Sequence, residues 1–330
     1  MPSHDSAAEH AAVRGAVGVL DRGDLGMLEV TGRDRASFLH ALLSNDITAR
    51  APGQGCAATL LDVHGKVQAL LRVLVLEDRV LVVTPPGAAA GTLDALDTYL
   101  FSEKAYMRDA SGEHAIAMLA GPEAVGTAAR LAGAPPGDAP WSHVSGTIGS
   151  AAVRLVRGSG ETGEPEVWIL SAAADGPAVW DAVVAAGARP IGRAAFETLR
   201  IEAGTPAFPD DMGPTVLLPE VPFADLVAQT KGCYIGQEVV VRIRDRGHVN
   251  RLLRGLTLDG ETVPPVGAGI VAGDAEVGKV TSAAWSPALK RPIALGFVRR
   301  QHAAAGTPVT VRADGATLAA TVSDLPFARA

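Results

Sequence analysis

The chain has 330 residues, of which 48% are apolar and 20% charged, a balance typical of a folded protein with more than one hydrophobic core. Its net charge of −7 and pI near 5.6 disfavour general binding to nucleic acid or anionic membranes, which requires clustered uncompensated cations. The first dozen residues show neither the basic nor the apolar region typical of a signal peptide, and no later apolar run approaches the roughly 18 residues of a membrane span. We therefore expect a cytoplasmic protein with neither nucleic acid nor membrane as its partner.

Strands and helices alternate irregularly through the first 190 residues. The expected strands cover 26–30, 60–61, 67–76, 79–84, 115–119, 152–157 and 167–171, and the expected helices cover 34–44, 93–100, 123–131 and 177–186. Residues 1–13 are expected to be disordered, and the segment 132–150, rich in Gly, Pro and Ala, to be a surface loop. Hairpins mixed with helices favour an α+β fold over a doubly wound α/β fold.

The second half contains one more helix, a long loop and a set of short strands. The helix ends at Gly204. Residues 205–230 contain five prolines, too many for regular structure, yet the segment is apolar enough to predict an ordered functional loop. Six short β-type runs between 255 and 322, separated by Gly, Pro and Asp turns, predict a small antiparallel barrel.

Cysteine usage excludes two kinds of site. The only cysteines, Cys56 and Cys233, lie 177 positions apart, which fits neither a disulfide framework nor a CxxC-type metal or cluster site. The histidines show no metal-like spacing, so no metal site is expected.

The octet 231–238, KGCYIGQE, is the densest group of chemically useful side chains. If Cys233 lies near the start of a following helix, that helix start and the nearby Lys231 would favour its thiolate, which makes Cys233 and Lys231 candidate catalytic residues. The alternative is a buried, inert thiol, as most free cysteines are. For Cys56, which has no charged neighbour in sequence, the inert interpretation is the stronger one.

The octet resembles the KGCYxGQE signature of the YgfZ-type proteins, folate-binding relatives of the glycine-cleavage T-protein. A basic run ending in Arg246-Gly247 follows it, as in that family. Further stretches resemble the same group over roughly residues 14 to 325: 26–46, the Asp62-x-x-Gly-Lys66 turn, the Leu-Arg-Ile-Glu-Ala-Gly run ending at Gly204, and 280–296.

The resemblance implies a GcvT-like ring of three domains, made of ferredoxin-like mixed-sheet domains and a C-terminal antiparallel β-barrel. The folate-binding domain would combine 14–110 with 193–250, the second α+β domain would cover 111–192, and the barrel would cover 251–330. It also implies tetrahydrofolate, or a one-carbon derivative of it, as the cofactor. The expected cofactor-binding residues are Glu202, for the pterin ring, and Tyr234, Gln237, Lys66 and Arg242.

One departure from the T-protein enzymes bears on function. Those enzymes use an acidic residue in an early loop, whereas the corresponding stretch here, 82–87, contains neither a carboxylate nor an Asn. The resemblance therefore favours a tetrahydrofolate-binding factor that supports iron–sulfur cluster assembly or repair, with client or assembly proteins as partners. The alternative is a folate-dependent methyl or aminomethyl transferase acting on a small substrate, so whether the chain is an enzyme stays open.

Overall fold

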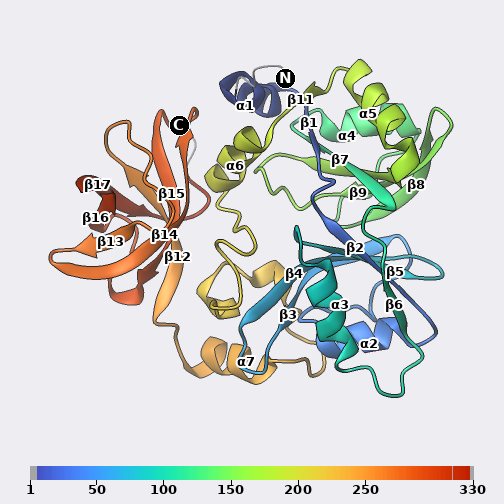
Figure 1. Ribbon diagram of the computed structural model, residues 1–330, viewed down its shortest axis with the longest axis horizontal. Coiled ribbons are helices and arrows are strands. Elements are labelled where there is room, and N and C mark those ends of the chain that lie inside the picture. The colour runs from blue at the N-terminus through green and yellow to red at the C-terminus, as the bar shows by residue number, and fades with distance from the viewer. Residues whose placement is uncertain (1–5, 314, 328–330) are drawn as a thin grey trace.

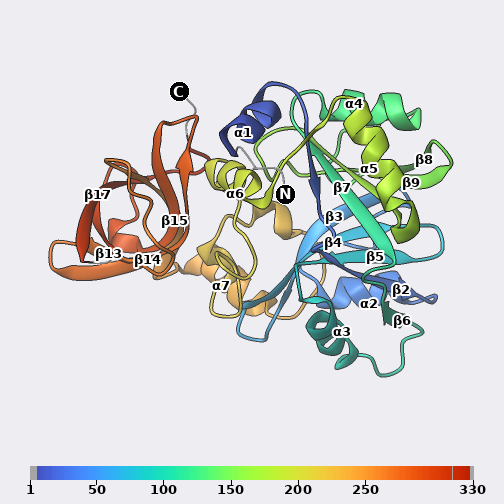
Figure 2. The same ribbon diagram turned by 45° about the horizontal axis from the view of Figure 1, so that its top comes forward.

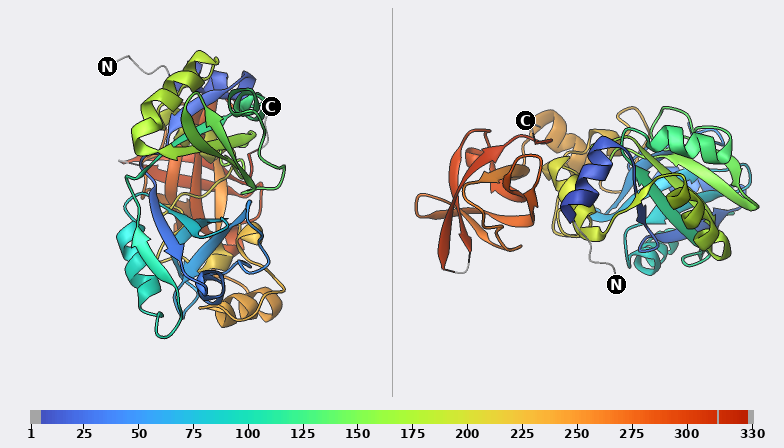
Figure 3. Two further views of the ribbon diagram at one scale, coloured as in Figure 1. Left: turned by 90° about the vertical axis from the view of Figure 1, so that its right-hand side faces the viewer. Right: turned by 90° about the horizontal axis from the view of Figure 1, so that it is seen from above.

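The computed structural model describes residues 6–313 and 315–327. Two units of helix and sheet lie together, a barrel stands beside them, and a long irregular segment runs between (Figures 1 and 2). Seen from the side of the two sheet units, the barrel lies behind both (Figure 3). This arrangement confirms the predicted α+β class with a C-terminal barrel. In the described part of the chain, no helix combines the length and apolar character that crossing a membrane requires.

The first unit is an antiparallel five-stranded sheet with the order β3-β4-β5-β2-β6. Its elements are β2 (Gly26–Thr31), α2 (Arg35–Leu42), β3 (Gln54–Leu61), β4 (Val67–Val75), β5 (Val80–Thr84), α3 (Ala89–Asp97) and β6 (Tyr106–Asp109). Successive side chains of a strand point to opposite faces, so Val82 packs against the helices while Leu81 and Val83 pack against the second unit. Burial of both faces explains the continuous apolar runs of these strands.

The second unit is a six-stranded sheet with the order β11-β1-β7-β10-β9-β8, in which only β1 and β11 run parallel. Its elements are β1 (Gly18–Asp21), β7 (His114–Ala120), α4 (Ala124–Ala132), β8 (His143–Ile148), β9 (Ala151–Arg157), β10 (Glu166–Ala172), α5 (Gly176–Ala185) and β11 (Arg189–Pro190).

Two predictions about this unit were wrong. The strand β1 pairs with β7 and so belongs to this sheet, although the residues 14–110 were assigned to the first domain. The segment 132–150 is not a loop throughout, because β8 forms a hairpin with β9. Its strand character depends on that partner, and its Ser, Gly and Thr content gives no local signal.

The barrel closes in the order β12-β15-β14-β13-β16-β17, as the six short runs predicted. Its elements are β12 (Arg251–Leu258), β13 (Gly269–Ala272), β14 (Ala275–Ser286), β15 (Arg291–Arg299), β16 (Pro308–Ala313) and β17 (Ala316–Ser323). A core of small aliphatic side chains fills it, and a second apolar cluster joins it to the irregular segment.

Three helices connect the units: α1 (Ser6–Gly15), α6 (Arg193–Glu202) and α7 (Gln237–Arg246). The predicted disorder of residues 1–13 is wrong for 6–13, which form most of α1, while 1–5 lie outside the described residues. Burial of Glu9, His10 and Val13 stabilises α1, which packs against α6. The segment 205–230 contains only short 3-10 turns and is ordered, as predicted.

Candidate functional site

A cavity of about 560 Å³ lies among the two sheet units and the irregular segment; we call it the central cavity. Its walls come from β3, β4, the turn before β10 and the residues 204–226, and they include Arg50, Cys56, Arg72, Trp141 and Glu161. Its volume is that of an ordinary cofactor or small-ligand site. The arrangement brings charged groups and two aromatic residues, Trp141 and Phe223, to a single opening.

The wall formed by Glu161 is strongly charged although it is buried. The Glu161 carboxylate accepts a very short hydrogen bond from Arg72 and a weaker one of 3.5 Å from Arg22. Burial raises the pKa of this carboxyl, but the two guanidinium groups outweigh it and hold the pKa below the usual value. Glu161 is therefore an anion whose two oxygens already have partners.

Two tryptophans support this wall. Their rings meet edge to face, with the centroids of Trp141 and Trp168 5.3 Å apart, and the guanidinium of Arg72 lies 5.9 Å from each ring centroid. Trp141 has a backbone φ of 66°, a conformation that bulky residues seldom adopt and that functional sites often retain. Trp141 is among the residues that line the central cavity.

Behind this wall lie two buried polar atoms without partners among the described residues: Oε2 of Glu166 and Nε1 of Trp168. A Cβ placed on Gly158 would lie 2.7 Å from the first and 3.4 Å from the second, so an acceptor and a donor lie close together beside Gly158. The other Glu166 oxygen accepts hydrogen bonds from the amide and hydroxyl of Thr162, at 2.7 and 2.9 Å. Burial and the Glu161 charge raise the pKa of Glu166 to about 7.

The octet lies beside the central cavity and is held by Lys231. The Lys231 ammonium donates to the main-chain oxygens of His40, Leu43 and Asn45 and lies 5.0 Å from the ring centroid of Tyr234. Burial lowers its pKa to about 8. Because Asn45 lines the cavity, the hydrogen bond from Lys231 to its main-chain oxygen helps to hold this part of the cavity wall in place.

The other residues of the octet point in different directions. Cys233 is exposed and is not among the cavity-lining residues, whereas Tyr234 is buried in the apolar cluster that reaches the barrel. Burial raises the pKa of the Tyr234 phenol, which has no hydrogen-bond partner in the described structure. Gln237 opens α7, and Arg242 is exposed on the same helix. The structure therefore does not gather Cys233, Gln237 and Arg242 around the cavity.

Lys66 lies in the turn that packs against the octet. At Gly236, whose φ is +77°, a side chain would approach the main-chain oxygen of Asp62 to 2.5 Å, and Gly65 lies close to Val239. Lys66 pairs through its backbone with Leu217. The turn and the octet thus pack against each other, and Lys66 is not among the residues lining the central cavity.

Glu202, the residue expected to contact the pterin, is not among the residues that line the central cavity. Its carboxylate accepts hydrogen bonds from His10 at 2.9 Å, Arg14 at 2.6 Å and Ser286 at 2.5 Å. Burial raises its pKa, but these three bonds outweigh burial and lower the pKa to about 2. With its oxygens occupied, Glu202 joins α1, α6 and β14.

Sequence reasoning missed Glu161, Glu166, Arg72 and Trp141. A signal was present, since three acids alternate with Thr, Gly and Pro in the run 161–166, directly before a buried strand. The stretch 82–87, where the early acid was sought, contributes no residue to the cavity lining. The acidic residues that line the cavity are Glu161, from the second unit, and Asp225, from the irregular segment.

Comparison with known proteins places this geometry in a family. Models of the GCVT N-terminal domain and of the glycine cleavage T-protein C-terminal barrel domain match residues 3–231 and 251–328. The chain is 35% identical to a probable aminomethyltransferase of Halobacterium salinarum, over 97% of this chain and 90% of that protein. It is 36% identical to an aminomethyltransferase of Frankia alni, over 97% and 88%.

A solved structure shares the fold of the whole chain. The glycine cleavage system aminomethyltransferase T of Bartonella henselae superimposes with a TM-score of 0.88 at 23% identity, covering 98% of this chain and 89% of that one. The predicted GcvT-like architecture is thus confirmed in both the sheet domains and the barrel. The chain belongs to the glycine cleavage T-protein family, the family of the folate-dependent aminomethyltransferases.

Proposed function

We propose that this protein binds a reduced folate in the central cavity, with Glu166 and Trp168 meeting the polar edge of the pterin. The supporting observation is the pair of buried atoms without partners, Oε2 of Glu166 and Nε1 of Trp168. Buried polar atoms are costly when they lack partners, and a pterin offers both an N–H for the carboxylate and an oxygen for the indole N–H. Glu161 cannot take this role, because Arg72 and Arg22 already occupy its oxygens.

The remaining groups of the cavity fit the rest of such a ligand. The Trp141 ring offers an aromatic surface for stacking, and Arg50, half-buried at the cavity, offers a cation for a carboxylate of the glutamate tail. A bound reduced folate would supply a carrier for a one-carbon group. This assignment replaces Glu202 by Glu166 as the acceptor for the pterin.

Isothermal titration calorimetry with tetrahydrofolate under anaerobic conditions tests this proposal. Glu166→Gln keeps the shape of the side chain but removes its charge, so we expect roughly tenfold weaker binding or more, the usual cost of losing a charge-assisted hydrogen bond. Arg50→Gln should also weaken binding. Glu238→Gln, at an exposed position of α7, is the matched control and should bind as wild type does. Equal affinity of Glu166→Gln and Glu238→Gln would remove the basis of the pterin assignment.

Two uses of the bound folate follow from different observations. The aminomethyltransferase relatives favour transfer of a one-carbon group to or from a small substrate. The exposed thiol of Cys233 favours the iron–sulfur assembly or repair role of the YgfZ-type proteins, because Lys231 and Tyr234 anchor the octet on both sides of Cys233 and leave the thiol in solvent. The lack of a carboxylate or Asn in 82–87 also favours this second use.

A substitution that leaves the cavity intact separates the two uses. Cys233→Ser should keep its affinity for tetrahydrofolate, since Cys233 is not among the cavity-lining residues. In cells that lack the protein, it should fail to restore iron–sulfur enzyme activity if the second use holds. Restoration equal to wild type would discard that use and leave one-carbon transfer as the function of the folate site.

A further inference from the structure

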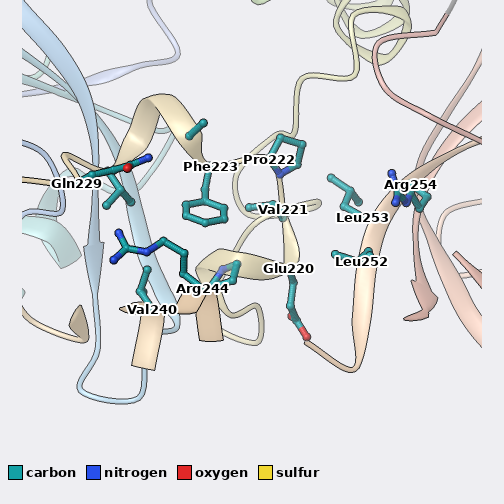
Figure 4. Close-up of a pocket in the computed structure, with 13 residues that line it drawn as sticks. Glu220, Val221, Pro222, Phe223, Gln229, Val240, Arg244, Leu252, Leu253 and Arg254 are labelled. Carbon is teal, nitrogen blue, oxygen red and sulfur yellow. The ribbon is translucent and has the colours of Figure 1, made fainter. Parts of the chain in front are cut away.

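A second cavity, of about 480 Å³, lies between the residues 219–229, α7 and β12; we call it the loop cavity. In Figure 4, Val240 and Arg244 reach it from α7, Leu252, Leu253 and Arg254 from β12, and Val221 lies between the two groups. It shares only the stretch 222–224 with the central cavity. The loop cavity is thus a separate site that borders the folate cavity through a common wall.

The walls of the loop cavity are mainly apolar. Val221, Phe223, Val240, Leu252 and Leu253 line it, and a ligand that removes such surfaces from water gains stability. Its volume falls within the usual range of small-molecule sites. The walls therefore fit the body of an aryl or branched-alkyl compound.

Of the three charged side chains that line the loop cavity, two, Glu220 and Arg244, form ion pairs with neighbouring residues. The Glu220 carboxylate accepts two hydrogen bonds from Arg251, each of 3.0 Å, and points away from the other lining side chains (Figure 4). Arg244 donates from two of its nitrogens to Asp245, at 2.6 and 3.1 Å. The Glu220 carboxylate and the Arg244 guanidinium therefore already have hydrogen-bond partners within the protein.

Arg254 differs from both. Its Nη1 donates to Asp324 at 2.9 Å, but its Nε is enclosed and has no hydrogen-bond partner among residues 6–313 and 315–327. An enclosed donor without a partner is costly, so a ligand that supplies an acceptor gains affinity from it. A carboxylate supplies such an acceptor, and it forms a stronger, charge-assisted hydrogen bond with a guanidinium than a neutral acceptor does.

We propose that the loop cavity binds a small amphipathic carboxylate, whose apolar body fills the cavity and whose acid group accepts a hydrogen bond from Nε of Arg254. None of the polar residues that line the loop cavity also lines the central cavity. Pro222, Phe223 and Ala224 line both cavities. A ligand in the loop cavity would therefore contact the same short segment that borders the proposed folate site.

The test titrates 4-phenylbutyrate, with the uncharged 4-phenylbutyramide as comparison, into the full chain carrying ¹³C-labelled Leu and Val methyl groups. We expect the acid to shift the methyl signals of Leu252, Leu253 and Val240 while the signal of Leu70, in the central cavity, stays unchanged. The amide should bind at least several-fold more weakly. Shifts at Leu70 alone, or none at millimolar acid, would overturn the proposal.

Three variants locate the acid group. Arg254→Met removes the donor and the ion pair, Arg254→Lys removes Nε but keeps a cation, and Asp324→Asn removes only the ion pair. We expect Arg254→Met and Arg254→Lys to weaken binding about fivefold or more, while Asp324→Asn, at an exposed position, binds the acid within about twofold of wild type. Unchanged binding by both Arg254 variants would refute the role of Nε, as would equal weakening by Asp324→Asn.

Discussion

The ammonium group of Lys231 donates a hydrogen bond of 3.3 Å to the main-chain oxygen of Asn45, 186 positions earlier in the chain. The side chain of Asn45 in turn donates to the main-chain oxygens of Ala57, at 2.8 Å, and Asp225, at 3.0 Å. Because Asn45 lines the central cavity, these bonds tie the octet, the first sheet and the irregular segment together at the cavity wall. Lys231 thus holds the octet in place against the first sheet unit, and the thiol of Cys233 is exposed.

Replacement of Lys231 should destabilise the protein. In Lys231→Met the main-chain oxygens of His40, Leu43 and Asn45 lose their common donor, which we expect to lower the free energy of unfolding by about 2–3 kcal/mol. Chemical denaturation followed by circular dichroism measures this. Lys104→Met, at an exposed position, is the control and should change the free energy of unfolding little. Equal stability of the two variants would show that the Lys231 bonds contribute nothing net.

Acid should weaken the contact between α1, α6 and the barrel at Glu202. The folded-state pKa of about 2 lies below the ordinary value of 4.5, so this carboxylate stabilises the fold fully above pH 4.5 and loses that contribution as the pH falls to about 2. The difference corresponds to roughly 3 kcal/mol. Thermal unfolding from pH 7 to pH 3 should therefore show a smaller pH dependence for Glu202→Gln than for wild type. Parallel curves for the two proteins would contradict this role.

Folate binding should release a proton near neutral pH. The pKa of Glu166 is raised to about 7, so part of the protein holds this carboxyl neutral at pH 7, while a pterin N–H requires the carboxylate. We expect affinity for tetrahydrofolate to rise as the pH increases from 6 to 8, by up to roughly tenfold. Calorimetry in buffers of different ionisation enthalpy measures the released proton. Glu166→Gln should release none, and proton release unchanged in that variant would assign the proton to another group.

The two cysteines should differ in reactivity. Cys233 is exposed, whereas Cys56 is buried in the cavity wall, and burial raises the pKa of Cys56 to about 11. Brief treatment with iodoacetamide, followed by mass spectrometry, should label Cys233 first, and the comparison is internal to one protein. Tetrahydrofolate should slow the labelling of Cys56 further and leave Cys233 unaffected. Faster labelling of Cys56 would contradict the described burial.

Much of the fold followed from the sequence because its signals are local. Helical spacing and apolar runs of a few residues placed most elements within a few positions, and turn residues between short runs predicted the barrel. The ordered character of 205–230 followed from its composition, because an apolar, proline-rich segment can pack without forming regular structure. The octet and the Asp62–Lys66 turn were found for the same reason, since each is a short contiguous pattern.

Contacts between distant segments decided the rest. The strands β1 and β8 depend on the partners that the sheet supplies, and α1 is stabilised by burial against α6. The same applies to the acids: Glu202 follows the expected motif, yet His10, Arg14 and Ser286, from two other elements, occupy its carboxylate. Glu166 has an oxygen without a partner because no described residue reaches it. The sequence by itself determined which residues carry charge, and only tertiary packing determined which of them face the cavity, because desolvation and pairing depend on neighbours far along the chain.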